Sequence, residues 1–297
     1  MNHSRRPRAG QLVWDMDIFD QIIELLERER MAGKRVLPLA RDELAALATP
    51  PAGPPGPSRA ATAAPSAGRS REPSRTRDAA DRGFRLEAEK SAPAVASMDW
   101  DALSGTVSSC TRCPLSRTRT QVVFGEGARN ADIMFIGEGP GYQEDQSGRP
   151  FVGPAGQLLT RMIRAMQYDR ESVFIANIVK CRPPGNRNPN EEEAAACLPY
   201  LHRQIELVDP EVLVLLGAVP LTYLLGKSGI TRLHGTWLEY RGRRVMPTFH
   251  PSYLLRSPQK KKEAWDDLKR VMEFLGRDPE ETLRRLKEKN RSGRETA

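Results

Sequence analysis

Residues 131–153 read ADIMFIGEGPGYQEDQSGRPFVG, a short apolar run followed at once by a loop rich in glycine and proline. Three further β-rich runs occur at residues 172–179, 211–217 and 243–250. Helical patterns separate the four runs, at residues 154–167, 190–208, 218–226 and 260–275. Strands that alternate with helices, and that are apolar along most of their length, are typical of a parallel sheet covered on both faces. The sequence therefore predicts an α/β fold with helices on both sides of a parallel sheet.

The sequence outside this core changes in composition. Residues 1–48 form a predicted N-terminal helical extension, with an apolar face at helical spacing over residues 14–31 and a second short helix at 41–48. Residues 49–97 are rich in Pro, Ala, Gly, Ser and Arg, and such a segment buries too little apolar surface to offset its ordering entropy. We therefore predict a disordered linker there, a globular domain at 98–276 and a charged C-terminal tail at 277–297.

Charge and hydropathy restrict the setting in which the chain works. The net charge is +8, which favours an anionic partner such as nucleic acid. No apolar run is long enough to span a bilayer, and the basic start lacks the apolar segment of a secretory signal. We expect a cytoplasmic, nucleoid-associated monomer without membrane contact, whose N-terminal helix is available for a protein partner.

The four cysteines come as two pairs, Cys110-x2-Cys113 and Cys181-x15-Cys197, with none left over. In a cytosolic chain such pairs indicate a metal site rather than disulfides. The spacing differs from a zinc ribbon, in which both pairs are close. It suits a [4Fe–4S] cluster held by thiolates from separated loops, with zinc as the alternative. Arginines and lysines flank both pairs, which suggests a structural cluster within a surface that meets a phosphate backbone.

A second group of unusual residues follows the ends of the predicted strands. Glu138 lies between glycines, Phe151 ends the same loop, Asn177 ends the second strand and His250 follows the fourth. Each could have an ordinary structural role when taken alone. Ligands of parallel sheets bind beyond the carboxyl ends of the strands, so together these residues predict a binding crevice there. The loop lacks the spacing of nucleotide-binding glycine motifs, which makes a nucleotide cofactor unlikely.

Several motifs carry a resemblance to a known family. They are GEGPGYQEDQSGRPFVGPAG at 137–156, NIVKCRPPGNRNP at 177–189, CLPYL at 197–201 and MPTFHPSYLLR at 246–256. Over residues 98–276 the chain resembles the family 4 uracil-DNA glycosylases, the iron–sulfur branch of that superfamily. The acidic pair Glu144 and Asp145 separates it from family 5, and it lacks the KRRIH insertion of the cross-linking branch.

The resemblance implies a three-layer α/β/α sandwich around a four-stranded parallel sheet. It implies that Cys110, Cys113, Cys181 and Cys197 bind a [4Fe–4S] cluster. The substrate would be a uracil flipped out of DNA, because its glycosidic bond cannot be reached inside a duplex. The residues implied to bind uracil are Gly137, Gly139, Glu144, Phe151 and Asn177. Among them Phe151 would stack on the base, Asn177 would bond O4 and N3–H, and Glu144 would exclude a methyl group at C5.

The resemblance also implies a mechanism, which is hydrolysis of the N1–C1′ bond through a cationic sugar and a departing uracil anion. His250 and the loop N–H groups would stabilise the charge on O2. Gly139 stands where family 1 enzymes carry a water-orienting Asp, so Glu138 is our candidate for that role. The segment after His250 would enter the DNA, with Ser252, Leu254, Leu255 and Arg256 as contacts. The alternative is that Leu254 and Leu255 begin a core helix.

These expectations combine into one functional hypothesis. The chain is expected to be a monofunctional uracil-DNA glycosylase of base-excision repair that leaves an abasic site. No lysine within the strand-end motifs stands where a Schiff-base nucleophile would be required, so no lyase activity is expected. The alternative is a non-catalytic iron–sulfur or zinc protein that binds nucleic acid with the same fold.

Overall fold

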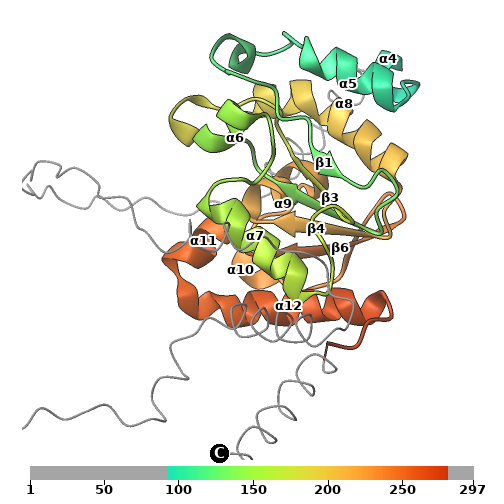
Figure 1. Cartoon of the computed structure of the whole chain (residues 1–297), viewed down its shortest axis with the longest axis vertical. Coiled ribbons are helices and arrows are strands. Elements are labelled where there is room, and N and C mark those ends of the chain that lie inside the picture. The colour runs from blue at the N-terminus through green and yellow to red at the C-terminus, as the bar shows by residue number, and fades with distance from the viewer. Residues whose placement is uncertain (1–92, 280–297) are drawn as a thin grey trace, which may run out of the picture.

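A computed structural model describes residues 93–279, which contain one mixed sheet of six strands in the order β1-β3-β2-β4-β6-β5 (Figure 1). The four middle strands are parallel and confirm the prediction from the sequence. They are β2 (Ile133–Gly137), β3 (Phe174–Asn177), β4 (Val212–Leu216) and β6 (Arg243–Thr248). Two short antiparallel edge strands, β1 (Glu126–Gly127) and β5 (Leu238–Tyr240), correct the expected count of four.

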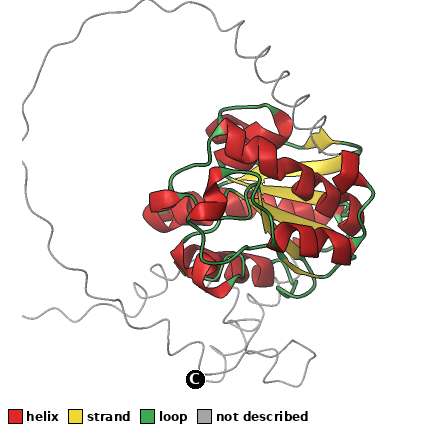
Figure 2. Ribbon diagram, turned by 90° about the horizontal axis from the view of Figure 1, so that it is seen from above, coloured by secondary structure: helices red, strands yellow, loops and turns green. Residues whose placement is uncertain are grey.

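Helices cover both faces of the sheet (Figure 2). Successive side chains of each strand point to opposite faces, so apolar strands give the sheet two apolar faces that must be covered. In β2, Met134 and Ile136 join one core cluster, whereas Ile133 and Phe135 join the other. The first cluster contains side chains of α4 (Pro93–Ala96), α5 (Trp100–Ser108), α8 (Glu191–Val208) and α9 (Ala218–Leu225). The second contains side chains of α7 (Pro154–Ala165), α11 (Pro251–Arg256) and α12 (Lys261–Phe274). The three-layer sandwich expected from the sequence is confirmed.

The register of the parallel strands sets which loops meet at the carboxyl edge of the sheet. Gly137 at the end of β2 is paired with Asn177 at the end of β3. Two short helices follow strand ends at this edge, α6 (Tyr142–Ser147) after β2 and α11 after β6. The remaining short elements are η1 (Pro114–Arg117), η2 (Pro184–Asn186), α10 (Ile230–Leu233) and η3 (Pro258–Lys260).

Several predictions concern residues outside the described range. The helices expected at 14–31 and 41–48, most of the linker and the tail from residue 280 onward all lie there. Residues 93–96, assigned above to the end of the linker, form α4, and Val95 is buried in the core. The packed unit therefore begins before Met98. In the part that is described, no helix has both the length and the apolar character needed to cross a membrane.

Candidate functional site

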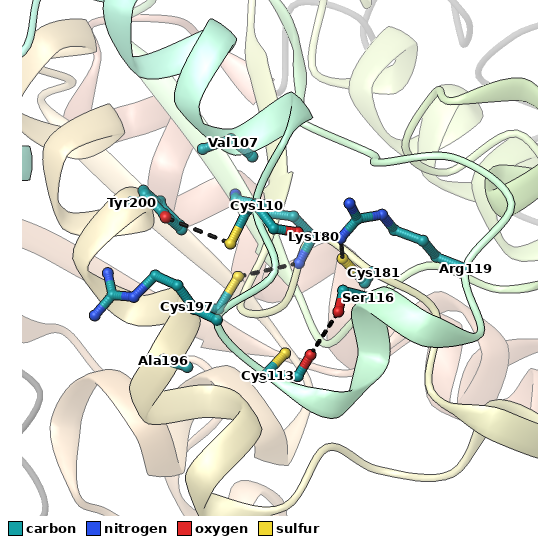
Figure 3. A pocket seen from close by; sticks show the side chains of 11 residues that line it. Val107, Cys110, Cys113, Ser116, Arg119, Lys180, Cys181, Ala196, Cys197 and Tyr200 are labelled. Atoms are coloured by element: carbon teal, nitrogen blue, oxygen red, sulfur yellow. Dashed lines mark hydrogen bonds between the residues drawn. The ribbon is translucent and has the colours of Figure 1, made fainter.

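The four cysteine side chains line one pocket, which we call the thiol site (Figure 3). Cys110 follows α5, Cys113 precedes η1, Cys181 lies after β3 and Cys197 belongs to α8. All four are free thiols. The structure thus brings together two pairs that are far apart in the chain, as the sequence predicts for a shared site.

Hydrogen-bond donors surround the sulfur atoms of the thiol site. Arg119 Nη1 donates to Cys181 Sγ at 3.2 Å, and the backbone N–H of Lys180 donates to Cys197 Sγ at 3.3 Å. Burial raises the pKa of Cys197 to about 12, so a thiol there would keep its proton at neutral pH in the absence of a cation. A bound metal removes that proton, and the resulting thiolate is a stronger acceptor for these N–H groups. The donor set therefore fits metal-bound thiolates.

The spacing of the sulfur atoms bears on the kind of metal. Within residues 93–279, no three Cys, His, Asp or Glu side chains are arranged to hold a metal ion. Zinc would need four sulfur atoms at about 2.3 Å from one point. In a [4Fe–4S] cluster each thiolate binds a different iron atom, so the sulfur atoms stand farther apart. Four cysteines around one pocket provide the number of thiolates that such a cluster needs.

Lys180 connects the thiol site to the carboxyl end of β3. Its side chain is 1% exposed, and its Nζ donates to the backbone carbonyl of Asn177 at 3.0 Å and to Gln204 Oε1 at 2.6 Å. Burial lowers the pKa of this ammonium to about 8, while the neighbouring thiols Cys197 and Cys181 act in the opposite direction. The same residue thus contacts the Cys197 sulfur through its backbone N–H and the Asn177 carbonyl through its side chain.

A second group, the strand-end site, consists of Gly137, Phe151, Asn177 and His250. A Cβ atom on Gly137 would lie 2.5 Å from both Asn177 Oδ1 and Phe151 Cζ, so only glycine permits these groups to approach. The rings of Phe151 and His250 have centroids 5.7 Å apart. An aromatic face, an amide and an imidazole therefore lie next to one another, as the sequence predicts.

The side-chain oxygen of Asn177 is buried without a hydrogen-bond partner. The residue is 1% exposed, and its Oδ1 has no hydrogen-bond partner. A buried acceptor without a partner costs about 1–3 kcal/mol, so proteins rarely keep one that serves no purpose. This oxygen is available to a ligand that presents an N–H group beside the Phe151 ring.

Phe151 has a backbone conformation that residues other than glycine rarely adopt. Its φ is 51°, in the left-handed region, and it is 6% exposed. Gly156 allows this, because a Cβ there would lie 1.9 Å from the Phe151 carbonyl oxygen. Arg170 donates to the Pro150 carbonyl on one side of Phe151. Such strain persists at functional sites because the surroundings impose it.

Glu144 anchors the loop that carries Phe151. Its Oε1 accepts the N–H groups of Val152 and Gly153, both at 2.9 Å, and its Oε2 accepts that of Gly141 at 3.1 Å. The carboxylate therefore joins the beginning of α6 to the beginning of α7. The role expected for Glu144, exclusion of a C5 methyl group, stays a prediction.

Glu138 follows Gly137 and is only partly buried. Its burial raises the pKa of the carboxyl above the usual value. Its backbone carbonyl accepts the N–H of Val179 at 3.2 Å, which keeps the loop after β2 beside the chain after β3. Gly139 is needed next to it, since a Cβ there would lie 2.8 Å from Val179 Cγ2. The structure is consistent with Glu138 as a carboxylate near the sheet edge.

The hydrogen bonds of His250 decide its tautomer. His250 is the N-cap of α11, and its Nδ1 accepts the backbone N–H of Ser252 at 3.1 Å. A backbone N–H can only donate, so Nδ1 carries no proton and the proton of the neutral ring lies on Nε2. Burial, followed by the charge of Arg256, lowers the pKa of His250 to about 4, whereas Glu144 opposes the shift. The ring is therefore a neutral donor near pH 7.

The segment after His250 divides into buried and exposed side chains. Leu254 is 0% exposed and lies in the core cluster of α7 and α12, which corrects the expectation that it contacts DNA. Leu255 is 39% exposed, and Arg256 is exposed beside it. Ser252 is partly buried, and its Oγ lies 2.8 Å from His250 Nδ1. Ser252, Leu255 and Arg256 remain the predicted DNA contacts.

Two supporting residues were not identified from the sequence. Lys180 directly precedes Cys181, and Arg170 lies in a loop with no motif of its own. Each makes a side-chain hydrogen bond to a residue 20 or more positions away, Lys180 to Gln204 and Arg170 to Pro150, which a linear pattern does not reveal. The position of Lys180 directly before Cys181 was the one available signal.

The chain is similar to known proteins of one superfamily. Residues 124–269 match the family model of the uracil DNA glycosylase superfamily. A type-4 uracil-DNA glycosylase of Thermotoga maritima is 46% identical over 183 residues, which are 60% of this chain and 95% of that protein. The type-4 enzyme of Sulfurisphaera tokodaii is 45% identical over 57% of this chain and 81% of its own length. The type-4 enzyme of Saccharolobus solfataricus is 44% identical over 60% of this chain and 88% of its own length.

Proposed function

Because this chain belongs to the type-4 uracil-DNA glycosylases, we propose that its strand-end site binds a flipped uracil and hydrolyses its bond to deoxyribose in DNA. The activity is that of a uracil-DNA glycosylase, which acts in DNA repair. The observation that carries the proposal is the buried, unpartnered Oδ1 of Asn177 beside the Phe151 ring.

Recognition of the base follows from that oxygen. Asn177 Oδ1 accepts N3–H of uracil, and the Nδ2 group donates to O4. Cytosine presents the reverse order, an acceptor at N3 and a donor at N4, so its binding would leave the amide mispaired. Phe151 stacks on the face of the base. A flipped uracil would thus supply the partner that the Asn177 oxygen lacks.

Cleavage of the glycosidic bond depends on His250, the loop N–H groups and Glu138. As the N1–C1′ bond breaks, its electron pair moves onto uracil and negative charge grows on O2. The Nε2–H of neutral His250 donates to that oxygen, and the loop N–H groups add to it. Glu138 holds the water that adds to C1′ or stabilises the cationic sugar. The products are uracil and an abasic site.

The test of this function is direct. The full chain is incubated with a 5′-labelled oligonucleotide that contains one deoxyuridine, and alkali then cleaves the strand at any abasic site. We expect scission at the deoxyuridine and none in an oligonucleotide with thymidine or deoxycytidine at that position. Intact strands after alkali, with a folded protein, would refute the proposal.

The thiol site is proposed to hold a [4Fe–4S] cluster through Cys110, Cys113, Cys181 and Cys197. A bound cluster would join four separate segments of the chain covalently. The donors from Arg119, Lys180 and Tyr200 would each bond a cysteine sulfur, since Tyr200 Oη lies 3.4 Å from Cys110 Sγ. N–H and O–H bonds to the sulfurs are one means by which proteins tune such clusters.

The proposal for the thiol site predicts an optical signature. Protein purified without oxygen should absorb near 400 nm, a rough expectation for such clusters, and dithionite should bleach the band. Iron and acid-labile sulfide should be present at about four atoms each per chain. Cys197→Ala should remove the band and lower the melting temperature. Stoichiometric zinc without a visible band would contradict the cluster.

A non-catalytic nucleic-acid-binding protein is the alternative from the sequence. Binding to DNA alone requires neither an unpartnered Asn177 oxygen nor a neutral histidine donor beside it. We therefore favour catalysis, with a single chain acting on uracil-containing DNA.

A further inference from the structure

Three large hydrophobic side chains are exposed in the described part of the chain: Tyr142 at 59%, Phe274 at 44% and Leu255 at 39%. Tyr142 begins α6 and Leu255 lies in α11, two helices that follow strands at the carboxyl edge of the sheet (Figure 1). Phe274 ends α12 and belongs to neither loop. Exposed aromatic side chains are common singly on protein surfaces, but Tyr142 lies at the edge that carries the strand-end site and has a guanidinium against its ring.

The Tyr142 ring is supported on one side by a guanidinium. Arg182 lies over it, with Cζ 5.2 Å from the ring centroid. Arg182 Nε donates to Asn186 Oδ1 at 2.7 Å, which orients the group. Within residues 93–279, Arg182 has no carboxylate as an ion-pair partner. A positive charge next to an exposed ring is thus available to an anionic ligand.

The loops that carry this pair run outward together from the strand-end site. Ile178 N donates to the Gly137 carbonyl at 3.0 Å, and Val179 N donates to that of Glu138 at 3.2 Å. Farther along, a Cβ on Gly139 would touch Val179 and Pro183. The Tyr142–Arg182 pair is a further contact between the two loops, and the Tyr142 ring is exposed.

The two acidic residues of α6 direct their carboxylates to backbone N–H groups of the protein. Asp145 is 2% exposed and accepts the backbone N–H of Thr120 at 2.9 Å. Glu144 accepts three backbone N–H groups, as described above. Both carboxylates are therefore turned inward, and the exposed side chains of the helix include Gln143 and Gln146.

We propose that Tyr142 and Arg182 form a nucleotide subsite that binds an unpaired base of the DNA strand next to the flipped uridine. The base stacks on the ring face opposite Arg182, and the guanidinium contacts a phosphate of the same strand. Aromatic rings bind unpaired bases in this way without regard to sequence. The inference rests on the proposed function, because that function brings a DNA strand to this edge. It assigns single-stranded DNA around the lesion as the preferred substrate.

The kinetic test compares Tyr142→Ala with Tyr142→Trp and with Phe274→Ala. Phe274 is a matched control, because it too is an exposed ring beside an arginine, Arg244 at 5.8 Å. On a single-stranded oligonucleotide, Tyr142→Ala should raise KM roughly 5- to 150-fold, the range for losing one stacked base. The tryptophan variant should restore KM, and Phe274→Ala should not change it. The rise should be smaller on a duplex, whose neighbouring bases stay paired.

A binding measurement separates stacking from a structural effect. The oligonucleotide carries an abasic analogue in place of deoxyuridine and the fluorescent base 2-aminopurine directly 5′ or 3′ of it. Wild-type protein should quench one of the two probes, and Tyr142→Ala should not. Arg182→Ala should lower the slope of log affinity against log salt by about 1.

The outcomes are distinct. An unchanged KM for Tyr142→Ala on single strands, or equal probe fluorescence with both proteins, overturns the subsite while uracil release stands. An equal rise in KM on duplex and single strand overturns the assignment to an unpaired base. Absence of uracil release by the wild-type chain refutes the proposed function itself.

Discussion

Replacement of His250 by alanine is expected to lower the rate of uracil release by about 10²–10³-fold, the usual cost of removing one donor to a developing oxyanion. The donor is Nε2–H, because Nδ1 accepts the backbone N–H of Ser252. The rate is best measured in a single turnover at saturating enzyme, which separates bond cleavage from product release.

Glutamine at position 250 supplies a matched control, since its side-chain amide keeps an N–H donor without a ring. We expect His250→Gln to retain part of the activity that the alanine variant loses. A loss below about threefold in His250→Ala would mean that another group stabilises the leaving uracil.

The pH profile of the wild-type rate tests the protonation state of His250. Burial lowers the pKa of His250 to about 4, so the ring is neutral above about pH 5 and no rate change from its titration is expected between pH 5.5 and 8. Burial raises the pKa of the Glu138 carboxyl, so this group takes up its proton at a higher pH than an ordinary glutamate does. Activity should fall on the acid side through Glu138, and Glu138→Gln should remove that limb. A wild-type rate that changes tenfold near pH 6.5 would instead indicate a titrating histidine.

Asn177→Asp is expected to change which base is removed. A carboxylate accepts from N4 of cytosine but opposes O4 of uracil, and each mispaired buried group costs about 1–3 kcal/mol. The ratio of uracil to cytosine release should therefore fall by roughly 10- to 100-fold. The ratio is measured with single-deoxyuridine and single-deoxycytidine oligonucleotides under the same conditions.

Asn177→Ala is the control for this change. Alanine removes the amide without offering an acceptor to cytosine, so uracil release should fall while cytosine stays intact. If the aspartate and alanine variants discriminated equally well, Asn177 would not be the residue that reads the base.

The sequence alone determined the four parallel strands, the sharing of one site by the two cysteine pairs, and the strand-end group of Phe151, Asn177 and His250. These features depend on local periodicity and on residues at strand ends, which parallel pairing brings to one edge. The edge strands β1 and β5 were missed because two or three residues carry too little pattern.

Only the tertiary structure decided the details on which the chemistry depends. It placed Leu254 in the core and Leu255 at the surface, although both lie in one short helix. It also left Asn177 Oδ1 without a hydrogen-bond partner and made Nδ1 of His250 the acceptor of the Ser252 N–H. The physical reason is that burial and hydrogen bonding of one side chain depend on atoms from distant segments. A linear pattern specifies which face a residue occupies, but not which atoms it meets there.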